Sequence, residues 1–156
     1  MHLIFNFNAC LQFPSLKLTA DFSHWFCVLS NMLDDHMDIV QEIAPQVRHI
    51  HGRVGYDNGP QVPDPRVCKQ SLRRQLTRST KAPEWLPWVE AHERCWDVVW
   101  EHQTKLGLEE TYFEPEYGPP TYCQTIPYSN KPVADIWDVS EWQTQRAVQR
   151  FQKTFS

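Results

Sequence analysis

A strand, a helix and a second strand are predicted in close succession near the start of the chain, and this order limits the fold more than any other feature. Residues 16–20 alternate between apolar and polar side chains, and residues 47–51 are interpreted as a second strand. After a loop expected around Trp25, residues 35–44 place apolar side chains at helical spacing, with Asp35 suited to cap the helix and Pro45 after its end. A β-α-β order is typical of a parallel sheet, so we expect an α/β protein.

The rest of the chain continues the alternation of helices and strands. Residues 84–106 carry a stripe of Trp and Val side chains, and Gly107 is suited to end this long helix. A third strand is predicted at 111–113 and a last helix at 134–154, whereas residues 52–82 form a long loop. With 156 residues and 41% hydrophobic content, the chain is suited to one packed domain.

Charge and cysteine content exclude several classes of protein. The net charge of −4 argues against a general nucleic-acid binder, and the absence of an apolar run of 18 residues argues against a membrane span. The five cysteines are an odd number without a Cys-x-x-Cys pair, which favours reduced thiols and a cytoplasmic location. Residues 67–81 carry five basic side chains and no acid, but they lack aromatic residues for base stacking, so we expect a solvated insertion there.

Each predicted strand ends in side chains that can ionise or bind a metal ion. These pairs are Asp21 with His24, His49 with His51, and Glu114 with Glu116. Ligands gather at the carboxyl ends of parallel strands, and a mixture of carboxylate and imidazole groups suits Mn²⁺, Co²⁺, Mg²⁺ or Zn²⁺. A single residue of this kind is often a helix cap, a packed histidine or a solvated carboxylate. Their placement at three successive strand ends favours a metal site.

Five blocks of the sequence form a specific combination. They are LTADFSHW at 18–25, HIHGRVGY at 49–56, GPQVPDPR at 59–66, PEYGPP at 115–120 and PVADIW at 132–137. Together they resemble sugar phosphate isomerase/epimerase proteins of the xylose isomerase-like TIM-barrel superfamily. The similarity runs from about residue 14 to about residue 151.

This resemblance implies a partial (β/α)₈ TIM barrel, with about three C-terminal βα units and an open sheet. A complete barrel needs about 250 residues. Residues 14–156 would be its C-terminal part, residues 1–13 an unmatched lead-in, and the basic stretch 67–81 an insertion into the family pattern. An open sheet edge, together with apolar side chains such as Leu18 and Ile50 exposed on the barrel interior, would then favour self-association.

For the metal, the resemblance implies Asp21, His51 and Glu116 as ligands from three successive strands. Glu114 is the alternative to Glu116, because either register of the third strand fits the pattern. The family has a fourth ligand, a Glu on the preceding strand, and residues 1–13 contain no counterpart for it. The ligand set for a divalent ion is therefore expected to be incomplete.

For catalysis, the resemblance implies movement of a carbonyl along a sugar or sugar phosphate. His24 would contact the substrate's oxygens, while Arg53 and Arg66 would bind its oxygens or its phosphate. Glu116 would be one of two carboxylates that relay a proton across a metal-stabilised enediolate. The second carboxylate belongs to the unmatched strand, so we expect the chain to be inactive alone.

Two other functions fit parts of the pattern. An endonuclease IV-type nuclease of the same superfamily shares the Asp-x-x-His element formed by Asp21 and His24. That site needs a further Asp-x-His, whereas Asp64 is here followed by Pro65 and Arg66. A non-catalytic protein that binds sugar or metal with the same residues is the remaining interpretation.

Overall fold

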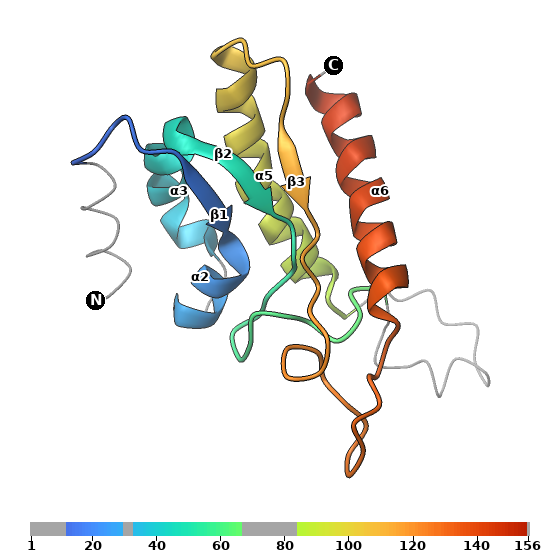
Figure 1. Cartoon of the computed structure of the whole chain (residues 1–156). Helices are drawn as coiled ribbons and strands as arrows, with labels where there is room; N and C mark the ends of the chain where they lie inside the picture. The colour runs from blue at the N-terminus through green and yellow to red at the C-terminus, as the bar shows by residue number, and fades with distance from the viewer. Residues whose placement is uncertain (1–11, 30–32, 67–83, 156) are drawn as a thin grey trace.

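The computed structural model describes residues 12–29, 33–66 and 84–155. The predicted lead-in of residues 1–13 lies outside this part except for its last two residues, and the predicted basic insertion of residues 67–81 lies outside it entirely. The described residues form a mixed α/β fold around one small sheet (Figure 1).

Three short strands form an open parallel sheet in the order β1-β2-β3 (Figure 1). They are β1 (Leu18–Asp21), β2 (Val47–His51) and β3 (Tyr112–Glu114). Helices connect successive strands, as parallel pairing requires. The predicted α/β class and small open sheet are confirmed, and the carboxyl ends of all three strands lie at one edge.

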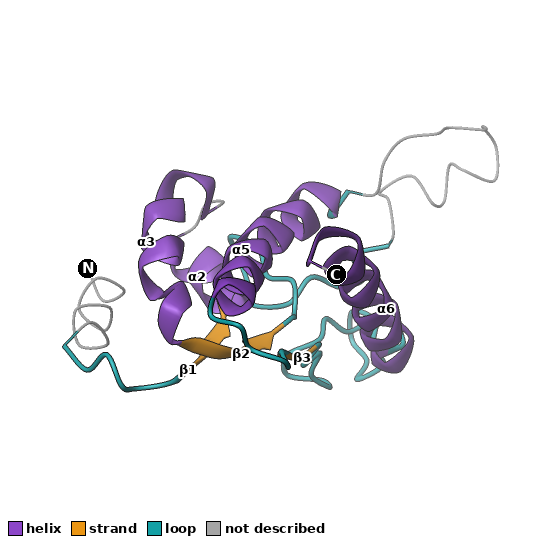
Figure 2. Ribbon diagram, turned by 90° about the horizontal axis from the view of Figure 1, so that it is seen from above, coloured by secondary structure: helices purple, strands orange, loops and turns teal. Residues whose placement is uncertain are grey.

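In the described part of the chain, four α-helices and two 3₁₀ turns accompany this sheet. They are α2 (Phe22–Leu29), η1 (Leu33–His36), α3 (Met37–Ile43), η2 (Ala44–Gln46), α5 (Leu86–Lys105) and α6 (Ile136–Phe155). The predicted helices at 35–44, 84–106 and 134–154 correspond to α3, α5 and α6. Seen from above, α3 and α5 cover one side of the sheet (Figure 2).

Helix α2 corrects the expectation of a loop around Trp25. Phe22 and Phe26 are four residues apart, so both lie on one face of the helix, where each is completely buried. The helix begins directly after β1, and Asp21 caps it: the Asp21 Oδ1 atom accepts the backbone N–H of Ser23 at 3.0 Å. Strand and helix therefore meet without an intervening loop.

The two faces of the sheet have different environments. Ala20, Ile50 and Phe113 are paired across the three strands, and they lie on the face that packs against the helices. There the Phe113 ring contacts the indoles of Trp96 and Trp100, with centroid distances of 5.1 and 6.0 Å. This aromatic cluster joins β3 to α5 and leaves the opposite face to polar side chains.

The position of Ile50 differs from the sequence prediction. Ile50 was expected to be exposed on the barrel interior, but it is completely buried beneath the helices. Because side chains alternate along a strand, Ile50 must face away from His49 and His51. The open face of the sheet is therefore the polar one.

A buried carboxylate joins the two long helices. The side chain of Glu93 on α5 is only 2% exposed and lies between Arg146 and Arg150 of α6. Arg146 Nε donates to Glu93 Oε1 at 2.6 Å, and Arg150 Nη1 donates to Glu93 Oε2 at 3.3 Å. Arg150 also pairs with Asp97 at 2.6 Å. These contacts fix α6 against α5.

Glu93→Ala is expected to lower the free energy of unfolding by about 2–3 kcal/mol. Removing one partner of a fully buried ion pair costs about 3–5 kcal/mol, and water partly solvates the two arginines here, which reduces the loss. Urea unfolding midpoints measure the change. Glu101→Ala is the matched control on the same helix, because its pair with Lys105 is solvent-exposed and should contribute little. Equal midpoint shifts in the two variants would contradict this role of Glu93.

Candidate metal centre

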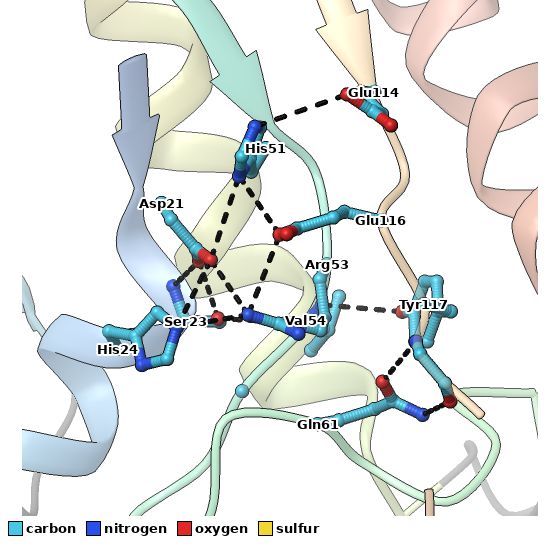
Figure 3. A network of polar contacts seen from close by, with 12 residues as sticks. Asp21, Ser23, His24, His51, Arg53, Val54, Gln61, Glu114, Glu116 and Tyr117 are labelled. Atoms are coloured by element: carbon cyan, nitrogen blue, oxygen red, sulfur yellow. Dashed lines mark hydrogen bonds and ion pairs between the residues drawn. The ribbon is translucent and has the colours of Figure 1, made fainter. Parts of the chain in front are cut away.

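Asp21, His51 and Glu116, called here the first trio, converge at the carboxyl edge of the sheet (Figure 3). Asp21 is the register partner of His51, so the two side chains lie on the same face of neighbouring strands. His51 Nδ1 lies 3.8 Å from Asp21 Oδ2 and 2.9 Å from Glu116 Oε2. One potential ligand atom from each residue lies within 4.8 Å of the others. The three residues expected as metal ligands are therefore brought together.

Glu116 reaches this group through an unusual backbone conformation. Its φ of 48° lies in the left-handed region, which costs a residue with a side chain about 1–3 kcal/mol. Its Oε2 atom is buried and forms no well-aligned hydrogen bond with a described residue, and its nearest neighbours are His51 Nδ1 at 2.9 Å and Arg53 Nη2 at 3.5 Å. A buried carboxylate oxygen without a partner is costly unless something positive occupies the space beside it. The Arg53 guanidinium supplies part of that positive charge, and the donor set of the first trio also fits a cation.

Asp21 has two roles in the structure, one for each carboxylate oxygen. Its Oδ1 atom caps α2 and also accepts the hydroxyl of Ser23, whereas Oδ2 faces His51. Burial would raise the pKa of Asp21, but the hydrogen bond from Ser23 and the guanidinium of Arg53 outweigh it and hold that pKa below its ordinary value. Asp21 is therefore a carboxylate at neutral pH, as a metal ligand must be.

Arg53 lies between the two carboxylates of the first trio. Its Nη2 atom lies 2.7 Å from Asp21 Oδ2 and 3.5 Å from Glu116 Oε2. Its Nε donates to Ser23 Oγ at 3.2 Å, and its guanidinium lies over the ring of Tyr122. The residue is only 2% exposed. Arg53 was expected to bind substrate, and the structure places it as a buried counter-charge within the site.

The other two predicted substrate-binding residues occupy different places. His24 lies at the rim: its side chain is 52% exposed, and its Nε2 is 3.4 Å from Asp21 Oδ2. Arg66 pairs instead with Asp64 at 2.8 Å and donates to the carbonyl oxygen of Asp138 at the start of α6. Only His24 therefore combines exposure with contact to the first trio. Glu114, the alternative ligand, approaches His51 from its other ring nitrogen, at 4.0 Å from Nε2.

Two residues without a role in the sequence analysis hold the loops around the site. The side-chain amide of Gln61 accepts the backbone N–H of Gly118 at 2.8 Å and donates to the Gly118 carbonyl at 3.3 Å (Figure 3). The hydroxyl of Tyr117 accepts the backbone N–H of Val54 at 3.3 Å. Both lie within the blocks that carry the family resemblance, which was the only signal available for them. Their bonds fix the loop that carries Glu116 against the loop after β2.

His92 on α5 contacts the loop after β2 through a hydrogen bond with Gly55. Its Nδ1 donates to the Trp88 carbonyl at 2.8 Å, and its Nε2 accepts the backbone N–H of Gly55 at 3.1 Å. The ring stacks on Phe26 with 4.0 Å between centroids. Burial lowers the pKa of His92 from 6.5 to about 4, so the ring is neutral at pH 7. A neutral ring is the only form that can accept the Gly55 N–H.

Comparison with family models, curated proteins and solved structures finds no match to this chain. Within residues 12–29, 33–66 and 84–155, no helix is both long and apolar enough to cross a membrane. The function of the site is therefore inferred from its own residues and their arrangement.

Proposed function

We propose that the first trio binds a divalent cation that holds adjacent oxygens of a sugar or sugar phosphate, the chemistry of metal-dependent isomerases and epimerases. The observation that carries the proposal is the convergence of Asp21, His51 and Glu116 at three neighbouring strand ends, where one potential ligand atom from each lies within 4.8 Å of the others. The sequence blocks that resemble that family support the choice of substrate class.

The donor set matches a small, oxygen-preferring ion. Two carboxylates and one imidazole suit Mn²⁺, Mg²⁺, Co²⁺ or Zn²⁺, and three protein ligands leave coordination positions open for substrate. When bound, such an ion polarises a carbonyl and stabilises developing negative charge. Arg53 already offsets part of the charge of the two carboxylates, so the affinity for the cation is expected to be weak.

Asp21, His24 and Glu116 would each have a distinct role in binding the cation and the substrate. Asp21 Oδ1 is committed to the cap of α2, which leaves Oδ2 as its ligand atom. His24, exposed at the rim, would hydrogen-bond a substrate hydroxyl. Glu116 would also be the carboxylate that exchanges a proton with the substrate carbon. A relay needs a carboxylate on each side of the substrate and the resemblance supplies only Glu116, so we expect this chain to bind without turnover.

Glu116→Gln is expected to weaken Mn²⁺ binding at least about tenfold, because it removes the charge of one ligand. Glu114→Gln is the matched control: it changes the neighbouring carboxylate, which lies outside the first trio, and should leave Mn²⁺ affinity unchanged. Loss of the free-Mn²⁺ electron paramagnetic resonance (EPR) signal on titration measures binding in both variants. Addition of a ketose phosphate to the Mn²⁺-loaded wild type should reduce water-proton relaxation, as sugar oxygens displace water.

The result that would overturn the proposal is equal Mn²⁺ affinity in Glu116→Gln and in the wild type. Unchanged water relaxation with a panel of ketoses, aldoses and their phosphates would leave a cation site but reject the sugar. Metal-dependent turnover of that panel by the chain alone would instead show that another carboxylate completes the relay.

A further inference from the structure

A second group of potential ligands lies beside the first trio on the same face of the sheet. His49, His51 and Glu114, called here the second trio, also place one ligand atom each within 4.8 Å of the others. We propose that the second trio is a separate cation site for ions that prefer imidazole nitrogen, such as Zn²⁺ and Cu²⁺, and that it competes with the first trio for His51. The inference shares His51 with the proposed function but does not depend on any sugar chemistry.

The spacing of the second trio suits an ion at its centre. His49 Nε2 and His51 Nε2 lie 3.8 and 4.0 Å from the same oxygen, Glu114 Oε2. The two imidazole rings are 5.0 Å apart and nearly perpendicular. Ligand atoms about 2.1 Å from one ion are about 3.4 Å apart in a tetrahedral set. The gaps here are too long for hydrogen bonds and slightly wider than that separation, so small movements of these exposed side chains would close them on a cation.

The ligand atoms of the second trio are free to bind. Among the described residues, none forms a hydrogen bond with the ring of His49 or with the carboxylate of Glu114. The side chains are about one third exposed for His49 and 59% exposed for Glu114, so solvent and ions can reach them. His49 and Glu114 do not belong to the helix-packed core, so packing of the core does not depend on their side chains.

The two trios differ in the ion that each should select. The first trio offers two carboxylates and one imidazole, which favours Mn²⁺ or Mg²⁺. The second trio offers two imidazoles and one carboxylate, a set that suits Zn²⁺, Cu²⁺ and Ni²⁺. Ion identity, rather than affinity alone, therefore decides which trio is occupied.

His51 cannot serve both trios at once. Its Nδ1 faces Asp21 and Glu116, whereas its Nε2 faces Glu114. A neutral imidazole has a lone pair on only one nitrogen. When Nε2 binds an ion, the proton resides on Nδ1, which lies 2.9 Å from Glu116 Oε2. A carboxylate in that position orients metal-binding histidines, so Glu116 changes from ligand to supporting group.

The first test counts the histidine nitrogens around Cu²⁺ by pulsed EPR on the full chain. The wild type should show two imidazole ligands. His49→Gln should show one and bind Cu²⁺ about 10–100-fold more weakly. Asp21→Asn, which leaves the three residues of the second trio unchanged and keeps an oxygen to cap α2, should keep both nitrogens while losing Mn²⁺ affinity. Glu114→Gln should weaken Cu²⁺ binding as well, and it serves in place of His49→Gln if that variant does not fold.

The second test is competition between ions. Zn²⁺ should displace Mn²⁺ from the wild type although the two ions use different trios, and His49→Gln should require at least about tenfold more Zn²⁺ for the same displacement. Simultaneous binding of one Mn²⁺ and one Zn²⁺ would overturn the proposal, as would Cu²⁺ binding that is unchanged in both His49→Gln and Glu114→Gln. If Mn²⁺ fails to bind the wild type but Cu²⁺ binding requires His49, the proposed function fails and this inference stands.

Discussion

Asp21→Ala is expected to lower the free energy of unfolding by about 3–5 kcal/mol, because it removes one partner of a buried ion pair. The side chain of Arg53 is only 3% exposed, and Asp21 Oδ2 at 2.7 Å is its closest acidic partner. The same substitution removes the cap of α2, which is typically worth about 1 kcal/mol. Mn²⁺ binding should be lost in the same variant, since a ligand is missing.

Urea unfolding of three variants separates these contributions. Asp21→Asn keeps an oxygen that can accept the Ser23 N–H, so it should cost less than Asp21→Ala. Adding Arg53→Met to Asp21→Ala should recover part of the stability, because the unpaired charge is then gone. Asp34→Ala breaks a half-exposed pair with Arg94 and is the surface control. A loss in Asp21→Ala no larger than in Asp34→Ala would show that the buried pair does not stabilise the fold.

Acid is expected to destabilise the protein well above the range in which carboxylates titrate, because of His92. Its pKa is about 4 in the folded state and 6.5 ordinarily, so between these values the unfolded chain binds more protons than the folded one. The contribution of His92 is therefore fully present above pH 6.5 and is lost as the pH falls toward 4. A difference of this size corresponds to about 3 kcal/mol.

Chemical unfolding at several pH values between 7 and 4 measures this loss. His92→Gln removes the titrating group and should flatten the dependence, even though it lowers stability at pH 7. If that variant does not fold, the ring resonances of His92 in the wild type provide the test by NMR. Titration of that ring near pH 6.5 in the folded protein would contradict its burial as a neutral acceptor.

The carboxyl edge of the sheet was predictable from sequence, because in a parallel sheet the ends of all strands meet there. Asp21 and His51 follow β-prone segments, and their pairing needs no further information. The choice between Glu114 and Glu116 was not predictable, since it depends on the left-handed backbone of Glu116, which the surrounding loop imposes. Both carboxylates in fact reach His51, from opposite sides of its ring.

The other differences between the sequence prediction and the structure have equally specific causes. The spacing of Phe22 and Phe26 is that of a helix, but α2 has only eight residues and follows β1 directly, so the helical pattern covers too few residues to predict it. Ile50 lies on the face opposite to the predicted one, as its alternation with His49 and His51 requires. Burial of Arg53 depends on side chains far apart in the chain, and no local pattern encodes it.

The amide of Gln61 holds the loop of Glu116 in place with two hydrogen bonds that involve no charge. Hydrogen bonds between neutral groups respond little to dissolved salt, in contrast to attraction between a cation and carboxylates. Raising the ionic strength should therefore weaken cation binding to the first trio without displacing the loop that carries Glu116. A protein built in this way keeps its candidate ligands at a constant spacing in dilute and in saline solution alike.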